Sequence, residues 1–132
     1  MKKAAHKLRF AILAVDTALF TVHDGMLKLL TVPVENPHFK GKLGLPGGLI
    51  APRETAHQAA ARHLASKGGV RSLLLMQLHT FSAVNRDPRG RVVSVAHYGL
   101  GKPSLCEHKT ANGTAWISVN KLPVLAYDHD DI

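Results

Sequence analysis

The chain has 132 residues, 45% of them hydrophobic, and its 17 Lys and Arg against 9 Asp and Glu give a formal net charge of +8. This length suits one globular domain whose hydrophobic core is large enough to be stable without disulfide bonds, so we expect a single domain over residues 1–132. The only cysteine, Cys106, excludes an internal disulfide framework and fits a reducing compartment.

The beginning of the chain has a partial likeness to a secretory signal. Four basic residues precede an apolar run at 10–15, but Asp16 ends that run, which is short for a secretory core. No segment approaches the length that spans a membrane. We therefore expect a cytoplasmic protein without a membrane partner.

The first third of the chain predicts a β-hairpin. Residues 8–22 run or alternate as an apolar strand, Asp24-Gly25 is a strong two-residue turn signal, and residues 26–32 should return antiparallel. Residues 33–42 then have the composition of a loop.

A helix is predicted over residues 54–67. Pro52 and Glu54 suit an opening turn, because proline lacks the donor that is unused there and a carboxylate complements the helix dipole. The run is rich in alanine and has an apolar stripe every four residues from Ala56. Gly68-Gly69 should end it.

The second half predicts more strands. Residues 73–79 and 91–100 are apolar or β-branched and flank a turn at 86–90, whereas residues 101–113 are polar and precede a short strand at 115–119. This order of strands and helix indicates an α/β chain.

Residues 44–70, GLPGGLIAPRETAHQAAARHLASKGGV, carry the most specific pattern. They resemble the Nudix box, in which glycine, five residues, glutamate and seven residues precede R-E-U-x-E-E-x-G-U, where U is a bulky aliphatic residue. The residues in register are Gly48, Glu54, Arg62, Leu64, Gly69 and Val70. The resemblance implies the α+β Nudix fold, a mixed β-sheet sandwiched between helices.

The three glutamates of the R-E-U-x-E-E core are replaced by His63, Ser66 and Lys67. The resemblance implies that Nudix hydrolysis depends on Mg²⁺ or Mn²⁺ held by those glutamates beside a diphosphate. Their i, i+3, i+4 spacing puts the replacements on one helical face, which now carries a cation. Lys67 is then either the counter-charge of a diphosphate or a solvated lysine, and His63 a residual ligand or an ordinary surface histidine.

Glu54 is the remaining acid of the pattern. It is either the partner of Arg62, which then braces the box, or a lone metal ligand and catalytic group. The second reading needs aspartates from elsewhere, such as Asp16, Asp24 or Asp87, and their spacing does not recommend them.

A second segment has three arginines beside the predicted turn: Arg86, Arg89 and Arg91. They predict either a bidentate anion site or a solvated hairpin tip. The surrounding TFSAVNRDPRGRVVSVAHYGL resembles ADP-ribose-handling Nudix proteins, and especially the Nudix domain of the Nudix-related transcriptional regulators of NAD metabolism. The end of the chain resembles their W...LP.LAFDH stretch through Trp116, Leu122, Pro123, Leu125, Ala126, Asp128 and His129.

Members of that subgroup often carry a degenerate box and sense ADP-ribose rather than cut it. In them a winged helix-turn-helix follows the Nudix domain. This sequence stops at Ile132, about where that domain would begin, so we expect no DNA-binding domain in this chain. Related domains commonly dimerise, which leaves a homodimer possible.

Two functions follow. The first is a binding module for ADP-ribose or a similar small-molecule nucleoside diphosphate derivative, which needs no cofactor; its ligand-binding candidates are Gly47, Gly48, Arg62, Lys67, Arg86, Arg89 and Arg91. The alternative is an ADP-ribose pyrophosphatase that uses Mg²⁺ or Mn²⁺ at a displaced metal site on Glu54. A basic nucleic-acid binder is a weaker third, because the basic residues are scattered and only 4 Phe, 2 Tyr and 1 Trp are available to stack bases.

Overall fold

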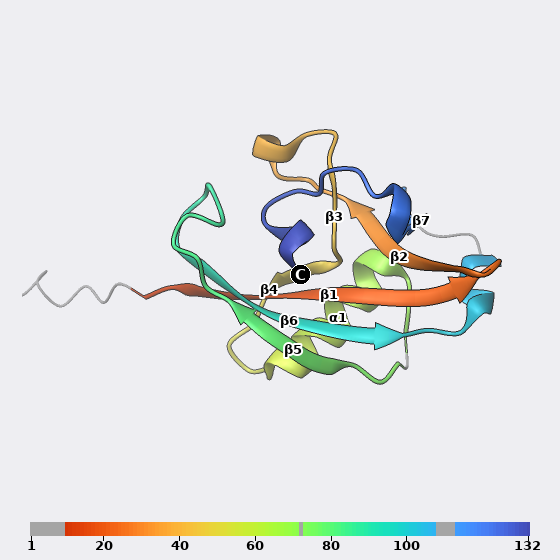
Figure 1. Ribbon diagram of the computed structural model, residues 1–132. Helices are drawn as coiled ribbons and strands as arrows, with labels where there is room; N and C mark the ends of the chain where they lie inside the picture. The colour runs from red at the N-terminus through yellow and green to blue at the C-terminus, as the bar shows by residue number, and fades with distance from the viewer. Residues whose placement is uncertain (1–9, 72, 108–112) are drawn as a thin grey trace, which may run out of the picture.

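The computed structural model describes residues 10–71, 73–107 and 113–132. Its centre is a mixed sheet in the order β3-β2-β1-β6-β5, with β4 paired to β1 and β7 to β2 (Figure 1). The strands are β1 (Ile12–His23), β2 (Met26–Pro33), β3 (Leu43–Gly44), β4 (Gly47–Leu49), β5 (Met76–Phe81), β6 (Val92–Leu100) and β7 (Ala115–Ser118). The helices are α1 (Ala56–Gly68) and the short 3-10 helices η2 (Pro37–Phe39), η3 (Pro103–Glu107), η4 (Val119–Lys121) and η5 (His129–Asp131).

The predicted hairpin joins β1 and β2. Asp24 and Gly25 have φ of 53° and 72°, the left-handed conformation that a tight two-residue hairpin requires. The register closes at His23 opposite Met26. β1 also pairs antiparallel with β4 and parallel with β6, which makes the sheet mixed.

Helix α1 begins later than predicted. The side chain of Thr55 accepts a hydrogen bond from the Gln58 backbone, and the Gln58 side chain accepts one from the Thr55 backbone, so these two residues form a capping box. Pro52 and Glu54 consequently lie in the preceding turn rather than in the helix. The predicted end is confirmed, since Gly69 adopts a left-handed φ of 71° directly after the helix.

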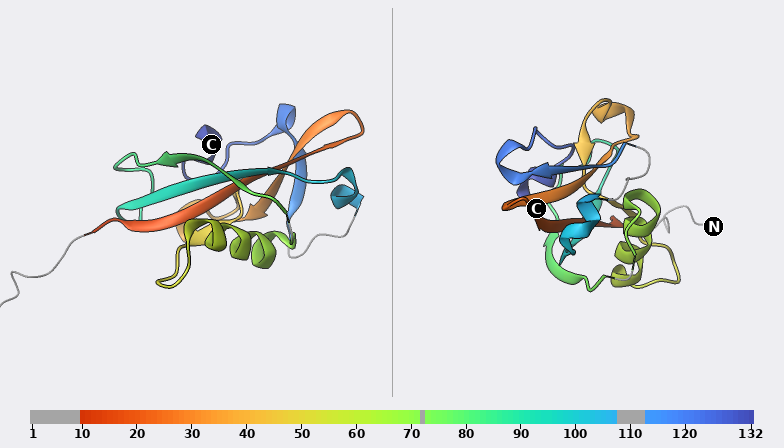
Figure 2. Two further views of the ribbon diagram at one scale, coloured as in Figure 1. Left: turned by 90° about the horizontal axis from the view of Figure 1, so that it is seen from below. Right: turned by 90° about the vertical axis from the view of Figure 1, so that its right-hand side faces the viewer.

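Two apolar layers cover the sheet. On one face, α1 packs Ala59, Ala60 and Leu64 against Val15, Leu19 and Leu30 of the central strands. On the other face, Leu125 of the C-terminal segment covers Ala18, Leu29 and Leu45. Figure 2 shows α1 and this segment on opposite sides of the sheet.

The expected α+β fold with a mixed sheet is therefore confirmed. The layer opposite α1 is built from extended chain and 3-10 turns instead of an α-helix. Within the described part of the chain, no helix is long and apolar enough to cross a membrane.

Strand β5 also begins later than predicted, at Met76, because Leu73 and Leu75 pack into the core beside α1. The short strand predicted at 115–119 is present as β7. The predicted polar loop at 101–113 contains η3 at its start, and its residues 108–112 lie outside the described residues.

Candidate ligand-binding site

A pocket of about 730 Å³ opens beside β4 and the first half of β1. Four segments surround it: residues 32–36, the stretch 45–52 through β4, the turn at 86–89, and the C-terminal segment. Helix α1 contributes Arg62, His63, Ser66 and Lys67. A volume of this size is in the range of small-molecule sites.

The three replaced positions of the box meet at this pocket. His63, Ser66 and Lys67 all line it, which confirms that they share one helical face. The Lys67 ammonium reaches back to β4 and donates a short hydrogen bond to the carbonyl of Gly47. This lysine is therefore held in place at the pocket, although its residue is exposed as a whole.

His63 is buried, contrary to the expectation of a surface histidine, with 8% of its area exposed. It fits because Gly48 has no side chain: a Cβ atom there would lie 2.3 Å from His63 Cε1. Burial lowers the pKa of His63, an effect that its contact with the Leu49 carbonyl only partly opposes. The neutral ring then donates from Nε2 to that carbonyl, at 2.9 Å.

The ion pair expected between Glu54 and Arg62 is present. Arg62 Nη2 lies 2.6 Å from Glu54 Oε1, and Arg62 Nε lies 3.0 Å from Oε2. The Ala51 backbone N–H also donates to Oε1. Hydrogen bonding from Arg62, together with that from Ala51, lowers the pKa of Glu54 to about 2. Because Arg62 reaches the Leu49 carbonyl too, the pair ties the loop before α1 to the helix.

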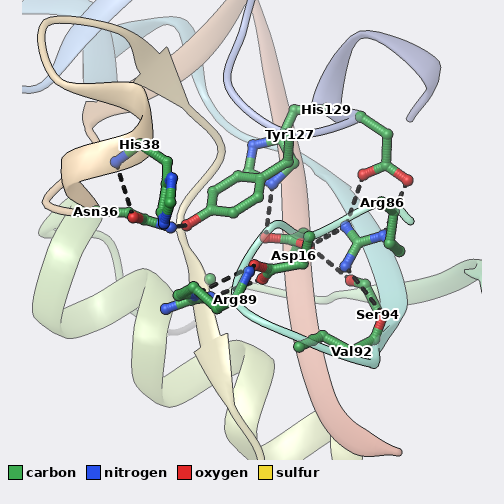
Figure 3. A network of polar contacts seen from close by, with 12 residues as sticks. Asp16, Asn36, His38, Arg86, Arg89, Val92, Ser94, Tyr127 and His129 are labelled. Carbon is green, nitrogen blue, oxygen red and sulfur yellow. Dashed lines mark hydrogen bonds and ion pairs between the residues drawn. The ribbon is translucent and has the colours of Figure 1, made fainter. Parts of the chain in front are cut away.

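The floor of the pocket is a buried polar network (Figure 3). Asp16 accepts a hydrogen bond of 2.6 Å from the Ser94 hydroxyl, and its other oxygen lies 3.2 Å from His129 Nε2. His129 Nδ1 accepts from the Leu45 backbone at 2.9 Å, so a neutral His129 carries its proton on Nε2 and donates to Asp16. Arg86 Nη2 is 3.7 Å from the same carboxylate.

Arg86 directs its guanidinium into the protein. Its Nε and Nη2 lie 2.9 Å and 2.6 Å from the two carboxylate oxygens of Asp128, and its side chain is 3% exposed. Burial lowers the pKa of Arg86, but the hydrogen bond to Asp128 and the nearby aspartates outweigh it, and the net pKa is raised. The guanidinium of Arg86, which was predicted to bind an anionic ligand, therefore binds Asp128 of the C-terminal segment instead.

Arg89 is the more accessible arginine of the pocket, with 54% of its side chain exposed. Its Nε and Nη2 hold Asp87 at 3.1 Å and 2.8 Å, and its guanidinium lies 5.7 Å from the ring centre of Tyr127. The Tyr127 hydroxyl accepts a hydrogen bond from Asn36. Arg91 is exposed, donates to the Ala83 carbonyl, and lies outside the pocket lining.

Sequence reasoning did not single out several residues of this pocket. It placed Asp16 only among distant aspartates and used Asp128 and His129 only as part of a resemblance. One signal was available: Asp16 stands inside the apolar run of β1, and a charged side chain buried in a strand requires partners.

The donor set at the box positions does not fit the divalent metal ion that the resemblance to the Nudix box implies. Among the described residues, no group of three or more His, Cys, Asp or Glu side chains is arranged to hold a metal. Both carboxylate oxygens of Glu54 accept hydrogen bonds from Arg62. Lys67 places a positive charge on the face of α1 where the Nudix pattern has its metal-binding glutamates.

The sequence and the fold identify the protein family to which this chain belongs. A family model described as the NUDIX domain matches residues 12–132, and the chain belongs to this family. It is similar to the ADP-ribose pyrophosphatase of Methanocaldococcus jannaschii, with 32% identity over 114 residues that cover 83% of this chain and 68% of that protein.

Two further proteins are similar to this chain over most of its length. The chain is 28% identical over 127 residues to the ADPR responsive transcriptional repressor NtrR of Acinetobacter baylyi, covering 92% of this chain and only 51% of the repressor. The structure resembles the Nudix domain of Shewanella oneidensis NrtR complexed with ADP ribose, with a TM-score of 0.79, 32% identity, and coverage of 99% of this chain and 94% of that one.

Proposed function

We propose that this chain is a Nudix domain that binds ADP-ribose or a similar nucleoside diphosphate derivative and hydrolyses it weakly or not at all. The observation that carries the proposal is the Lys67 ammonium, which is tied to the Gly47 carbonyl at the pocket. Lys67 stands where the Nudix pattern has the last glutamate of its E-E pair.

Lys67 supplies charge of the sign that a diphosphate needs. An ammonium has three donors, and the Gly47 carbonyl takes one, which leaves two for phosphate oxygens. Hydrogen bonds between charged groups are roughly twice as strong as neutral ones. Because the hydrogen bond to Gly47 orients the ammonium before the ligand arrives, less side-chain entropy is lost on binding.

Arg89 is the second cation in this proposal. Its Nε and one N–H of Nη2 hold Asp87, so Nη1 and the second N–H of Nη2 are left to meet phosphate oxygens. Tyr127, beside Arg89, adds an aromatic wall. Arg62 and Arg86 are fastened to Glu54 and Asp128, so we propose that they shape the pocket rather than hold the ligand.

The relatives support this class of ligand. A pyrophosphatase named for ADP-ribose and a Nudix domain complexed with ADP ribose each share 32% identity with the chain. We also propose that residues 1–132 form a single domain. We propose further that the protein acts in the cytoplasm and in NAD metabolism.

Isothermal titration calorimetry with ADP-ribose tests the proposal. We expect binding in EDTA with an affinity that Mg²⁺ does not raise. Lys67→Ala should weaken it by roughly tenfold or more, since a hydrogen bond to a charged group contributes about 1.5–3 kcal/mol. Lys102→Ala, which removes an exposed lysine outside the pocket lining, is the matched control. Binding that requires Mg²⁺, or no binding at all, would contradict the proposal.

A turnover assay tests the second half of the proposal. We expect little or no release of AMP from ADP-ribose with Mg²⁺ or Mn²⁺. Rapid metal-dependent release that Glu54→Gln abolishes, in a variant that still folds, would show instead a hydrolase with a metal site on Glu54.

A further inference from the structure

A pair of histidines lies where helix α1 meets the sheet. His97 of β6 is buried, with 2% of its area exposed, and its ring centre lies 6.1 Å from that of His57 near the start of α1. Val95, two residues before His97, and Ala56, next to His57, pack against the hydrophobic cluster between α1 and the sheet. His97 therefore belongs to the contact that holds α1 in place.

The surroundings of His97 suit a neutral ring. Its Nδ1 lies 3.1 Å from the Val95 carbonyl, so the neutral ring carries its proton on Nδ1 and donates a hydrogen bond there. The neighbouring strands place Thr17 of β1 and Gln77 of β5 opposite His97, and neither of these side chains is charged. Among the described residues, the titratable group that acts on the ring is His57 of α1, which is itself a base. A second proton on the ring is therefore buried without a carboxylate of the described residues to offset its charge.

The pKa of His97 sets the direction of its response to acid. Burial lowers this pKa below its usual 6.5, the hydrogen bond to the Val95 carbonyl opposes the effect in part, and the charge of His57 lowers the pKa further. The unfolded chain therefore binds the proton before the folded chain does. The stability that depends on a neutral His97 is fully present above pH 6.5 and is lost as the pH falls below that value.

We propose that His97 acts as a pH-sensitive latch, which holds α1 against the sheet while its ring is neutral and releases the helix when mild acid protonates the ring. The release is local, because β2 keeps its pairing with β1 and β7 when α1 moves. Arg62, His63 and Lys67 line the pocket from α1, so the release also draws these side chains away from β4. The latch goes beyond the proposed ligand binding and does not rest on it, since both of its tests use the protein without ligand.

A second buried histidine on α1 acts in the same direction. His63 lies against β4, and burial lowers its pKa as well. Substitution of His97 should therefore remove a part of the response to mild acid, equivalent to one proton, rather than all of it.

Urea unfolding over a pH series from about 7.5 to about 5.5 tests the latch. Below pH 6.5, the folding equilibrium constant of the wild type should fall by up to roughly tenfold more per pH unit than that of His97→Gln, because the unfolded wild type binds one more proton. His57→Gln changes an exposed residue and should also show a shallower fall than the wild type, since it removes a charge that opposes protonation of His97. His38→Gln makes the same substitution at an exposed histidine of η2 and should follow the wild type.

Hydrogen exchange of the wild-type protein gives a readout that needs no variant. After correction for the intrinsic pH dependence of exchange, the backbone amides of Ala56–Gly68 should lose protection in mild acid, while those of Met26–Pro33 keep theirs. The same pH dependence in the wild type and His97→Gln would overturn the proposal. So would α1 amides that stay protected in mild acid, or that lose protection together with those of β2.

Discussion

Gly47 of β4 lies so close to Asp16 of β1 that a Cβ atom at Gly47 would come within 2.3 Å of Asp16 Oδ1. The same atom would lie 2.3 Å from the carbonyl oxygen of Val15. This contact joins the two halves of the pocket, since Asp16 belongs to the buried floor and the Gly47 carbonyl holds Lys67. It explains why the turn-rich stretch of the box needs glycine here: the reason is space rather than a special φ.

Gly47→Ala should therefore destabilise the protein by about 3 kcal/mol, because the new methyl group meets backbone that cannot move aside. Urea unfolding measures the change. Binding of ADP-ribose should also fall, since the carbonyl that orients Lys67 is displaced. A Gly47→Ala protein as stable as the wild type would show that β4 does not pack against β1 in this way.

Gly48→Ala should behave differently, because its methyl group meets the side chain of His63 instead of backbone. We expect a loss of about 1–2 kcal/mol of unfolding free energy. In the Gly48→Ala, His63→Ala double variant the clash is absent, so the two losses should be less than additive in a double-mutant cycle. Strict additivity would contradict the contact.

Asp128→Asn should cost about 3 kcal/mol of unfolding free energy, because it leaves the buried guanidinium of Arg86 without its bidentate partner. Asp131→Asn makes the same charge change at an exposed neighbour and should have little effect. The two unfolding curves, measured side by side, separate the ion pair from the loss of one negative charge. Equal stability of both variants would argue against the clamp.

The stability of the protein should decline on acidification through the ion pair of Glu54. The folded pKa of Glu54 is lowered from 4.5 to about 2, chiefly by hydrogen bonding from Arg62. The unfolded chain therefore binds a proton before the folded chain does, and the contribution of the pair, present above pH 4.5, is lost as the pH falls toward 2. Glu54→Gln should show a shallower pH dependence of its unfolding free energy in this window. Identical slopes would contradict the assignment.

Asp87→Asn should strengthen the binding of ADP-ribose by roughly threefold to tenfold, because it releases Arg89 from an internal ion pair to meet the diphosphate. The same change should lower stability, since Asp87 is buried and also accepts a hydrogen bond from the Arg89 backbone. Calorimetry and thermal unfolding of one sample follow both effects. Weaker binding would show that the pair positions Arg89 for the ligand.

Short sequence patterns were sufficient to predict much of the fold. Asp24-Gly25 predicts the hairpin because only a few residue types adopt left-handed φ in both turn positions, and the structure has that geometry. The spacing of residues 44–70, which resembles that of the Nudix box, predicts the helix and the pairing of Glu54 with Arg62, and the structure contains both. The start of α1 was less readable, because the capping box of Thr55 competes with proline and glutamate as a start signal.

The partners of charged groups depend instead on distant strands. Nothing near Arg86 in the chain shows that its guanidinium meets Asp128, 42 positions away, or that His129 reaches Asp16. The β1–β6 register and the return of the C-terminal segment create these contacts. Residue types and helical spacing thus identify the family and one face of the pocket. Only tertiary packing decides which cations are paired with aspartates and which side chains line the pocket.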